Sequence, residues 1–125
     1  MIGLFVGESQ IDYMKAGNSL TSCEPRKRLD QIDPDLVPNQ LKAIGQVFDV
    51  ADESGEPRMQ ATLKDCFITT YGNPDMRLIT GLGFSQVAEF HNGYSEFWKA
   101  NFPKAKLLSN TELFISIWEP VKATE

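Results

Sequence analysis

Alternating hydrophobic and polar positions between residues 43 and 70 predict a long antiparallel hairpin. In the first run, residues 47–51, Phe48 and Val50 share one parity. Period-two alternation places successive side chains on opposite faces of a sheet. In the second run one parity holds Met59, Ala61, Leu63 and Asp65, and the other holds Gln60, Thr62, Lys64 and Cys66. Between the runs, Gly55 can adopt a positive φ and Pro57 lacks a backbone donor, so we expect the turn there.

The remaining hydrophobic patterns predict strands at residues 2–6, 17–23 and 112–118, and helices at 8–16, 75–82 and 85–101. In the last strand one face holds Leu113, Ile115 and Ile117, and the other holds Phe114, Ser116 and Trp118. In the longest helix, five apolar residues recur at helical spacing and are expected in the core: Val87, Phe90, Tyr94, Phe97 and Trp98. Gly93 in the middle of this helix indicates close packing there.

Residues 24–39 predict a long irregular connection. It opens with the basic run Arg26, Lys27 and Arg28, and Pro34 and Pro38 follow. Loops of this length are often functional, although a solvated surface excursion fits equally well. The order of elements predicts an α+β fold, a small open β-barrel that is mixed but mainly antiparallel and is flanked by helices, in a single domain over residues 1–125.

Composition narrows the function classes. The chain has 125 residues, is 42% hydrophobic and 23% charged, and carries a net charge of −5. This balance argues against a broad basic surface that coats nucleic acid, but leaves room for a small local basic site. No apolar run approaches the ~20 residues of a membrane helix, and the first residues lack a basic leader, so we expect a cytoplasmic protein. Cys23, Cys66 and His91 show no metal-ligand spacing, so we expect neither a metal nor another cofactor.

The chain resembles the ASCH domain family in several blocks. Residues 45–58 resemble the family's central hairpin, and residues 16–22 lie where the family has a G-x-K-x-x-T motif. The glycines of Gly81-Leu82-Gly83 precede an aromatic helix like the family's, and residues 115–121 resemble its last strand. This resemblance implies a PUA-like barrel and an association with RNA. Some small family members are amidohydrolases that deacetylate N4-acetylcytidine nucleosides with a lysine, a threonine and a glutamate.

The resemblance also shows where this chain departs from that activity. The lysine position falls on Ser19, the hydroxyl position falls on Ser22, and the carboxylate position falls on Leu82. Amide hydrolysis needs a base or an activated nucleophile and a proton donor for the leaving amine, and leucine supplies none of these. Four nearby side chains are candidates to stand in for the missing groups: Lys15, Glu24, Arg26 and Glu89.

Six residues are the candidate binding residues. Ser19, Thr21 and Ser22 either line a polar pocket or bond to backbone along a polar strand; Ser19 and Ser22 are also the weak catalytic candidates. Arg26, Lys27 and Arg28 either bind phosphates or form a solvated charge run. The site is expected where residues 17–28 meet residues 81–84. His91 is expected at the surface.

The sequence therefore predicts a non-catalytic ASCH-like module that binds RNA, a nucleotide or a modified base. One alternative is an amidohydrolase of N4-acetylcytidine-type nucleosides. The other is a regulatory factor that binds a protein partner through the same fold. No membrane partner is expected, and the ligand and the oligomeric state stay open.

Overall fold

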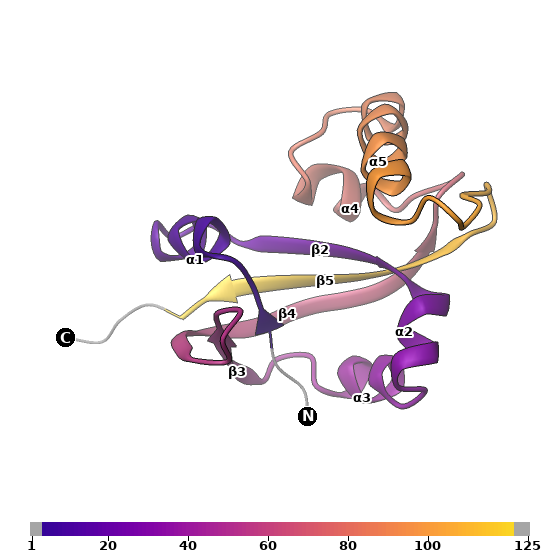
Figure 1. Ribbon diagram of the computed structural model, residues 1–125. Helices are drawn as coiled ribbons and strands as arrows, with labels where there is room; N and C mark the ends of the chain where they lie inside the picture. Colours follow the sequence, from indigo (N-terminus) through magenta and orange to yellow (C-terminus); the bar gives the residue numbers. More distant parts are fainter. Residues whose placement is uncertain (1–3, 122–125) are drawn as a thin grey trace.

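The sheet is built around its longest strand, β4 (Pro57–Thr70), in the computed structural model, which describes residues 4–121. The hairpin partner β3 (Val47–Ala51) pairs with one side of β4, and β5 (Glu112–Pro120) pairs with the other, both antiparallel. β1 (Leu4–Phe5) joins β3 in parallel, and β2 (Leu20–Pro25) joins β5 antiparallel. The order is β1-β3-β4-β5-β2, and the sheet curls into a half-barrel whose edges are β1 and β2 (Figure 1). The predicted hairpin and the α+β open barrel are confirmed.

The hairpin turn is held by Asp52. Its Oδ1 accepts hydrogen bonds from the backbone N–H of Ser54 and Glu56 and from the Ser54 hydroxyl. Gly55 takes the predicted positive φ, at 88°. Arg58 bridges the turn to the first helix, because its guanidinium contacts both Asp52, at 3.2 Å, and Glu8.

The alternation in β4 does not continue to its end as the sequence predicted. The pairing with β5 shifts between Leu63 and Asp65, so Lys64 is the extra residue of a β-bulge. Before the bulge, Ala61 and Leu63 point into the half-barrel; after it, Cys66 does so. The predicted grouping of Leu63 with Asp65 on one face is therefore wrong, because one inserted residue exchanges the faces of all that follow.

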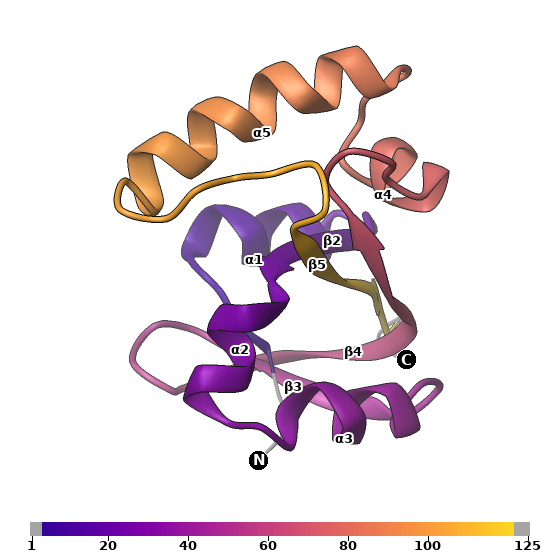
Figure 2. The same ribbon diagram turned by 90° about the vertical axis from the view of Figure 1, so that its right-hand side faces the viewer.

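Two hydrophobic cores form, one on each side of the sheet. The interior core draws on all five strands and is closed by α1 (Glu8–Lys15), α2 (Arg26–Ile32) and α3 (Leu36–Lys42). The outer core lies under α4 (Met76–Gly81) and α5 (Val87–Asn101), which cover the opposite face of β4 and β5 (Figure 2). The predicted alternation of β5 is confirmed: Leu113 and Ile115 enter the outer core, and Phe114 and Trp118 enter the interior core.

The predicted irregular connection at residues 24–39 is wrong, because the structure has the helices α2 and α3 there. Leu29 on α2 and Val37 on α3 are buried, so the segment is held by the interior core and is no surface excursion. Pro38 is the third residue of α3, a position whose N–H has no intrahelical acceptor, so proline costs no hydrogen bond. The prolines that indicated a loop are compatible with two short helices.

The long helix follows its prediction with one exception. Phe90, Tyr94 and Trp98 are buried as expected, but Phe97 is 48% exposed. The helix rests on the sheet through residues spaced four apart, and Phe97 lies beside that row. The close packing expected at Gly93 is confirmed, since a Cβ there would lie 3.1 Å from the Phe84 ring.

Three single features complete the description of the fold. The predicted strand at 2–6 is present at Leu4–Phe5, and its first residues lie outside the described part. Cys66 is buried and Cys23 is half-buried; burial raises the pKa of the Cys66 thiol to about 11 and of the Cys23 thiol to about 12. Among residues 4–121, no helix combines the length and apolar character needed to cross a membrane.

We predict that Asp52→Asn flattens the dependence of stability on pH. Hydrogen bonds from Ser54, from Glu56 and from Arg58 lower the pKa of Asp52 to about 2. A carboxyl group whose pKa is lowered on folding stabilises the protein above its unfolded pKa of ~3.9, and this stabilisation is lost as the pH falls toward 2. Urea midpoints should therefore differ between wild type and variant at pH 7 and converge near pH 2.

The matched control is Asp49→Asn, because Asp49 is exposed on β3 and has no ion-pair partner among the described residues. This control should follow the wild-type pH curve. Equal curves for wild type and Asp52→Asn would show that the turn carboxylate does not couple folding to protons.

Candidate functional site

A cleft of about 690 Å³ lies between β2, β4 and α4, and we call it the β2–α4 cleft. Its walls come from four segments of the chain: Ser19 and Thr21; Lys64 and Asp65; Met76, Arg77, Thr80 and Gly81; and Ile117. Its volume lies within the ~300–1,000 Å³ range of small-molecule pockets. The cleft lies where the sequence placed a site, at the contact between residues 17–28 and the end of α4.

Alternation along β2 divides the candidate hydroxyls between two places. Ser19 and Thr21 share a parity and line the β2–α4 cleft. Ser22 has the opposite parity, faces the half-barrel interior, and donates weakly to the Ser116 carbonyl at 3.5 Å. The structure therefore brings Ser19 and Thr21 together but separates Ser22 from them, since neighbours on a strand point to opposite faces.

Gly81 lets α4 approach β2. A Cβ at this position would overlap the Thr21 side chain, and its distance to Thr21 Cγ2 would be 3.1 Å. Glycine is the one residue without a Cβ, so the floor of the cleft depends on it. The steric overlap with Thr21 thus explains why this chain has glycine at position 81, within the segment that resembles a family motif.

The charges in the cleft are already paired. Arg77 contacts Asp65 at 2.6 Å and Asp75 at 2.9 Å, and its guanidinium carbon lies 3.9 Å from the centroid of the Phe67 ring. Asp75 caps α4 by accepting from the Arg77 N–H, and these Arg77 contacts lower the pKa of Asp75. Lys64 pairs with Glu119 at 3.4 Å. The cleft therefore offers hydroxyls and compensated charges, with no free cationic group aimed at a phosphate.

The basic run lies at the other end of β2. Arg26 pairs with Glu112 at 3.1 Å and with Asp30 at 3.7 Å. Arg28 pairs with Glu24 at 3.0 Å and lies over the Phe102 ring. At ~3.3 Å per residue, the strand separates Ser19 from Arg26 by about 20 Å. The structure does not bring Arg26, Lys27 and Arg28 into one site with Ser19 and Thr21.

The predicted stand-ins for the missing catalytic groups do not line the cleft. Leu82 packs against the outer core. Glu89 accepts from the backbone N–H and hydroxyl of Ser85 at the start of α5, and the Ser85 hydroxyl lowers its pKa. Arg26 and Glu24 are engaged at the far end of β2, as described. An ammonium and a carboxylate are nevertheless present in the cleft, because Lys64 and Asp65 of β4 supply them.

Sequence reasoning missed Lys64, Asp65, Arg77 and Thr80. The available signal was the pair of consecutive polar residues between Leu63 and Cys66, which interrupts the alternation and marks a bulge. Arg77 and Thr80 lie three residues apart, so they share one face of α4. That spacing alone does not say which strand the face meets.

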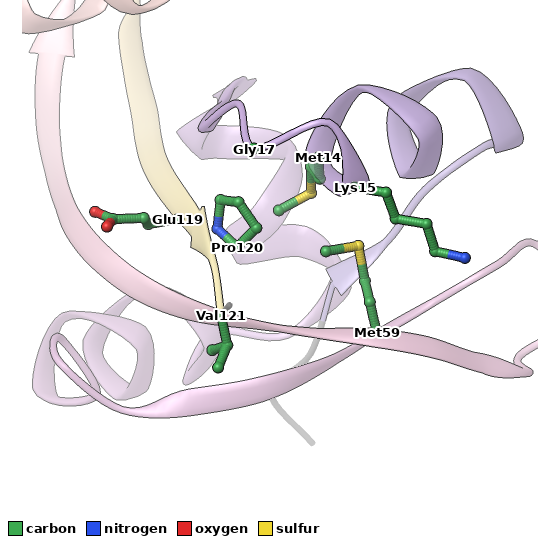
Figure 3. A pocket seen from close by; sticks show the side chains of 7 residues that line it. All are labelled: Met14, Lys15, Gly17, Met59, Glu119, Pro120 and Val121. Atoms are coloured by element: carbon green, nitrogen blue, oxygen red, sulfur yellow. The ribbon is translucent and has the colours of Figure 1, made fainter. Parts of the chain in front are cut away.

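A second cleft, of about 440 Å³, opens at the end of α1. Figure 3 shows its apolar walls from Met14, Met59, Pro120 and Val121, with the charged ends of Lys15 and Glu119 pointing away from one another. Lys15, another predicted stand-in, lies here and not in the β2–α4 cleft. This cleft contains few polar groups that converge, so the β2–α4 cleft is the stronger candidate.

Comparison with solved structures identifies the fold. The chain is similar to EF3133 from Enterococcus faecalis V583, a DUF984 protein, with a TM-score of 0.68 and 12% identity over 97% of this chain and 77% of that one. It is also similar to the ASCH domain from Lactobacillus crispatus JV V101, with a TM-score of 0.62 and 14% identity over 94% of this chain and 79% of that one. The chain has an ASCH-like fold. The sequence itself matches no family model and no curated protein.

At these identities the likeness establishes the ASCH-like fold alone. The predicted small open barrel is thereby supported by independent structures. The roles of Ser19, Thr21, Ser22 and the basic run stay predictions.

We predict that Gly81→Ala destabilises this ASCH-like fold by ~1–3 kcal/mol, because the new methyl group overlaps Thr21 where α4 crosses β2. Thr21→Ala removes the obstructing hydroxyl and methyl groups. The double variant should therefore recover most of the loss, giving a clear interaction energy in a double-mutant cycle measured by urea unfolding. Additive effects of the two substitutions would contradict the proposed contact.

Proposed function

We propose that this ASCH-like chain is a non-catalytic binding module whose β2–α4 cleft holds a nucleoside or modified base. The observation that supports the proposal most directly is the cleft itself, which is lined by three hydroxyl-bearing side chains: Ser19, Thr21 and Thr80. Hydroxyls both donate and accept, which suits the mixed edges of a base and a ribose. Met76 and Ile117 add apolar surface against which a flat ring can pack.

The paired charges favour an uncharged ligand over a phosphorylated one. A phosphate at Arg77 would have to displace Asp65 or Asp75, and at Lys64 it would compete with Glu119. Displacing a carboxylate leaves that carboxylate without its partner, which offsets the new contact. We therefore rank nucleosides and free modified bases above nucleotides for this cleft.

RNA binding would use the basic run as a separate contact. Arg26, Lys27 and Arg28 lie on α2, and Lys27 has no ion-pair partner among the described residues. Arg26 and Arg28 would exchange their carboxylate partners for phosphates, so their contribution is small. The net charge of −5 also opposes extended contact with a phosphate backbone.

An amidohydrolase is the second candidate because of Lys64 and Asp65. With Thr21 in the same cleft, they provide an ammonium, a carboxylate and a hydroxyl, the residue types that the family resemblance associates with deacetylation of N4-acetylcytidine. Both charged groups are held by other residues: Asp65 by Arg77 and Lys64 by Glu119. Each of these groups would have to leave its partner to reach a substrate, so we rank catalysis below binding.

We predict that cytidine or N4-acetylcytidine binds the purified chain and that Thr21→Val weakens this binding roughly three- to tenfold. Valine keeps the shape of threonine and removes one hydrogen-bonding group, whose loss costs ~0.5–1.5 kcal/mol. Isothermal titration calorimetry measures the change. Thr62→Val is the matched control, because Thr62 lies on β4 outside the cleft. No binding of either nucleoside at millimolar concentration would refute the proposal.

We predict that N4-acetylcytidine is not converted to cytidine during prolonged incubation with the protein, as measured by chromatography. Conversion that disappears in Lys64→Ala and in Asp65→Asn would replace binding with hydrolysis as the function.

A short single-stranded RNA titrated at low salt tests the RNA-binding alternative, since phosphate contacts are strongest at low salt. Tight, salt-sensitive RNA binding lost in a Lys27→Ala variant would move the function to α2.

A further inference from the structure

The half-barrel leaves a seam between its two edge strands, β1 and β2. These strands do not pair with one another in the described part of the chain, and a cavity of about 310 Å³ lies inside the seam. Leu4 and Phe5 border it from β1, and Leu20 and Ser22 border it from β2. The cavity lies mainly on the interior face of β2, which Ser22 faces. Thr21 lines both this cavity and the β2–α4 cleft, and its side chain lies against Gly81 of α4.

A buried polar pair forms part of the cavity wall. Gln40 is 8% exposed and Ser116 is 2% exposed, although both lie beside the interior hydrophobic core. The Gln40 Nε2 donates to Ser116 Oγ at 2.5 Å, and the backbone carbonyl of Gln40 accepts from the Cys66 thiol at 3.5 Å. The first contact holds the carboxamide, and the second holds the backbone of α3 at this residue.

One polar atom of that carboxamide has no partner. Among the described residues, nothing donates to Gln40 Oε1, while the residue lines the cavity. The amide oxygen and nitrogen could be exchanged in this bond, because Ser116 can also donate. In either orientation one carboxamide atom has no hydrogen-bond partner among the described residues, so it is available to a molecule in the cavity that Gln40 lines.

The rest of the lining is mainly apolar and carries no free charge, although Gln10, Thr21 and Trp118, whose indole N–H has no partner among the described residues, also line the cavity. Leu29, Leu36 and Phe114 contribute apolar surface. Glu24 is the one ionisable side chain among its lining residues, and it is paired with Arg28 at 3.0 Å. A charged ligand would find no partner there and would lose its hydration. The chemistry therefore selects an uncharged, compact ligand that brings its own hydrogen-bonding group.

We propose that this cavity is a second ligand site, which binds a small uncharged cyclic amide of the lactam type. A lactam presents an N–H and a C=O side by side. Its N–H donates to Gln40 Oε1, and its C=O accepts from the Ser22 hydroxyl, whose present bond to Ser116 is long at 3.5 Å. With the carboxamide turned over, the lactam C=O accepts from Gln40 Nε2. The ring packs against the leucines and Phe114.

The test is a titration of the full chain with 2-piperidone, followed by 1H–15N NMR. Millimolar affinity is expected for so small a ligand. The shifts should appear in the Gln40 side-chain amide and in the backbone of Ser22 and Ser116, and not at Thr80 or Gly81. Cyclohexanone has the same ring size without the N–H and should bind about tenfold more weakly. Shifts confined to the β2–α4 cleft, equal binding of the two rings, or no shifts at all would each overturn the proposal.

Two variants separate recognition from folding. Gln40→Leu keeps a similar volume and removes the carboxamide, so 2-piperidone binding should fall about tenfold or more. Ser22→Ala leaves the Gln40–Ser116 pair intact and should weaken binding by about threefold. If Gln40→Leu fails to fold, Ser22→Ala decides alone, and unchanged affinity in it contradicts the site.

A cross-control keeps this site distinct from the proposed nucleoside site. Thr80→Val alters the β2–α4 cleft and should leave 2-piperidone binding unchanged. Ser22→Ala should likewise leave nucleoside binding unchanged. If 2-piperidone binding falls in Thr80→Val, the two cavities are one site and the inference fails, whatever the outcome of the nucleoside titration.

Discussion

The bulge at Lys64 is the constraint on which the arrangement of this molecule depends. β4 has fourteen residues and must serve two cores, one inside the half-barrel and one under α4 and α5. A regular strand would keep Leu63 and Phe67 on the same face. The extra residue places Phe67 in the outer core and turns Asp65 toward Arg77. The outer core and the charged wall of the β2–α4 cleft both follow from that single shift in register.

The cleft then results from two structural features, of which neither is polar. α4 lies close to β2 because Gly81 has no side chain to overlap Thr21. Its orientation is fixed by the burial of Leu78 and Ile79 in the outer core. Arg77 and Thr80, on the remaining face of the helix, are thereby directed at the cleft. The polar site is positioned by packing, and its charges are balanced by neighbours that the same packing provides.

β2 connects the two proposed sites because it is an edge strand with both faces occupied. Ser19 and Thr21 serve the outer cleft, whereas Ser22 serves the interior cavity. The family resemblance had grouped these hydroxyls into one motif. Those positions hold Ser19, Ser22 and Leu82 in this chain, so no lysine–threonine–glutamate set forms from them, and the comparable groups in the cleft come from β4 instead. The two proposed sites would each use hydroxyls of β2.

The sequence by itself determined the hairpin, the helices α1, α4 and α5, the alternation of β5 and the open barrel, because each depends on local periodicity and turn chemistry. Resemblance to a family also indicated Ser19, Ser22 and the segment Gly81-Leu82-Gly83, and Thr21 was a candidate as the neighbour of Ser22. The sequence did not reveal α2 and α3, whose prolines and aspartates are equally suited to a loop until Leu29 and Val37 are buried. Only the tertiary structure decided the bulge, the meeting of Lys64 and Asp65 with Arg77, and the unpaired carboxamide of Gln40. Each of these depends on which segments lie side by side, and contacts between segments distant in the chain produce no local periodicity in the sequence.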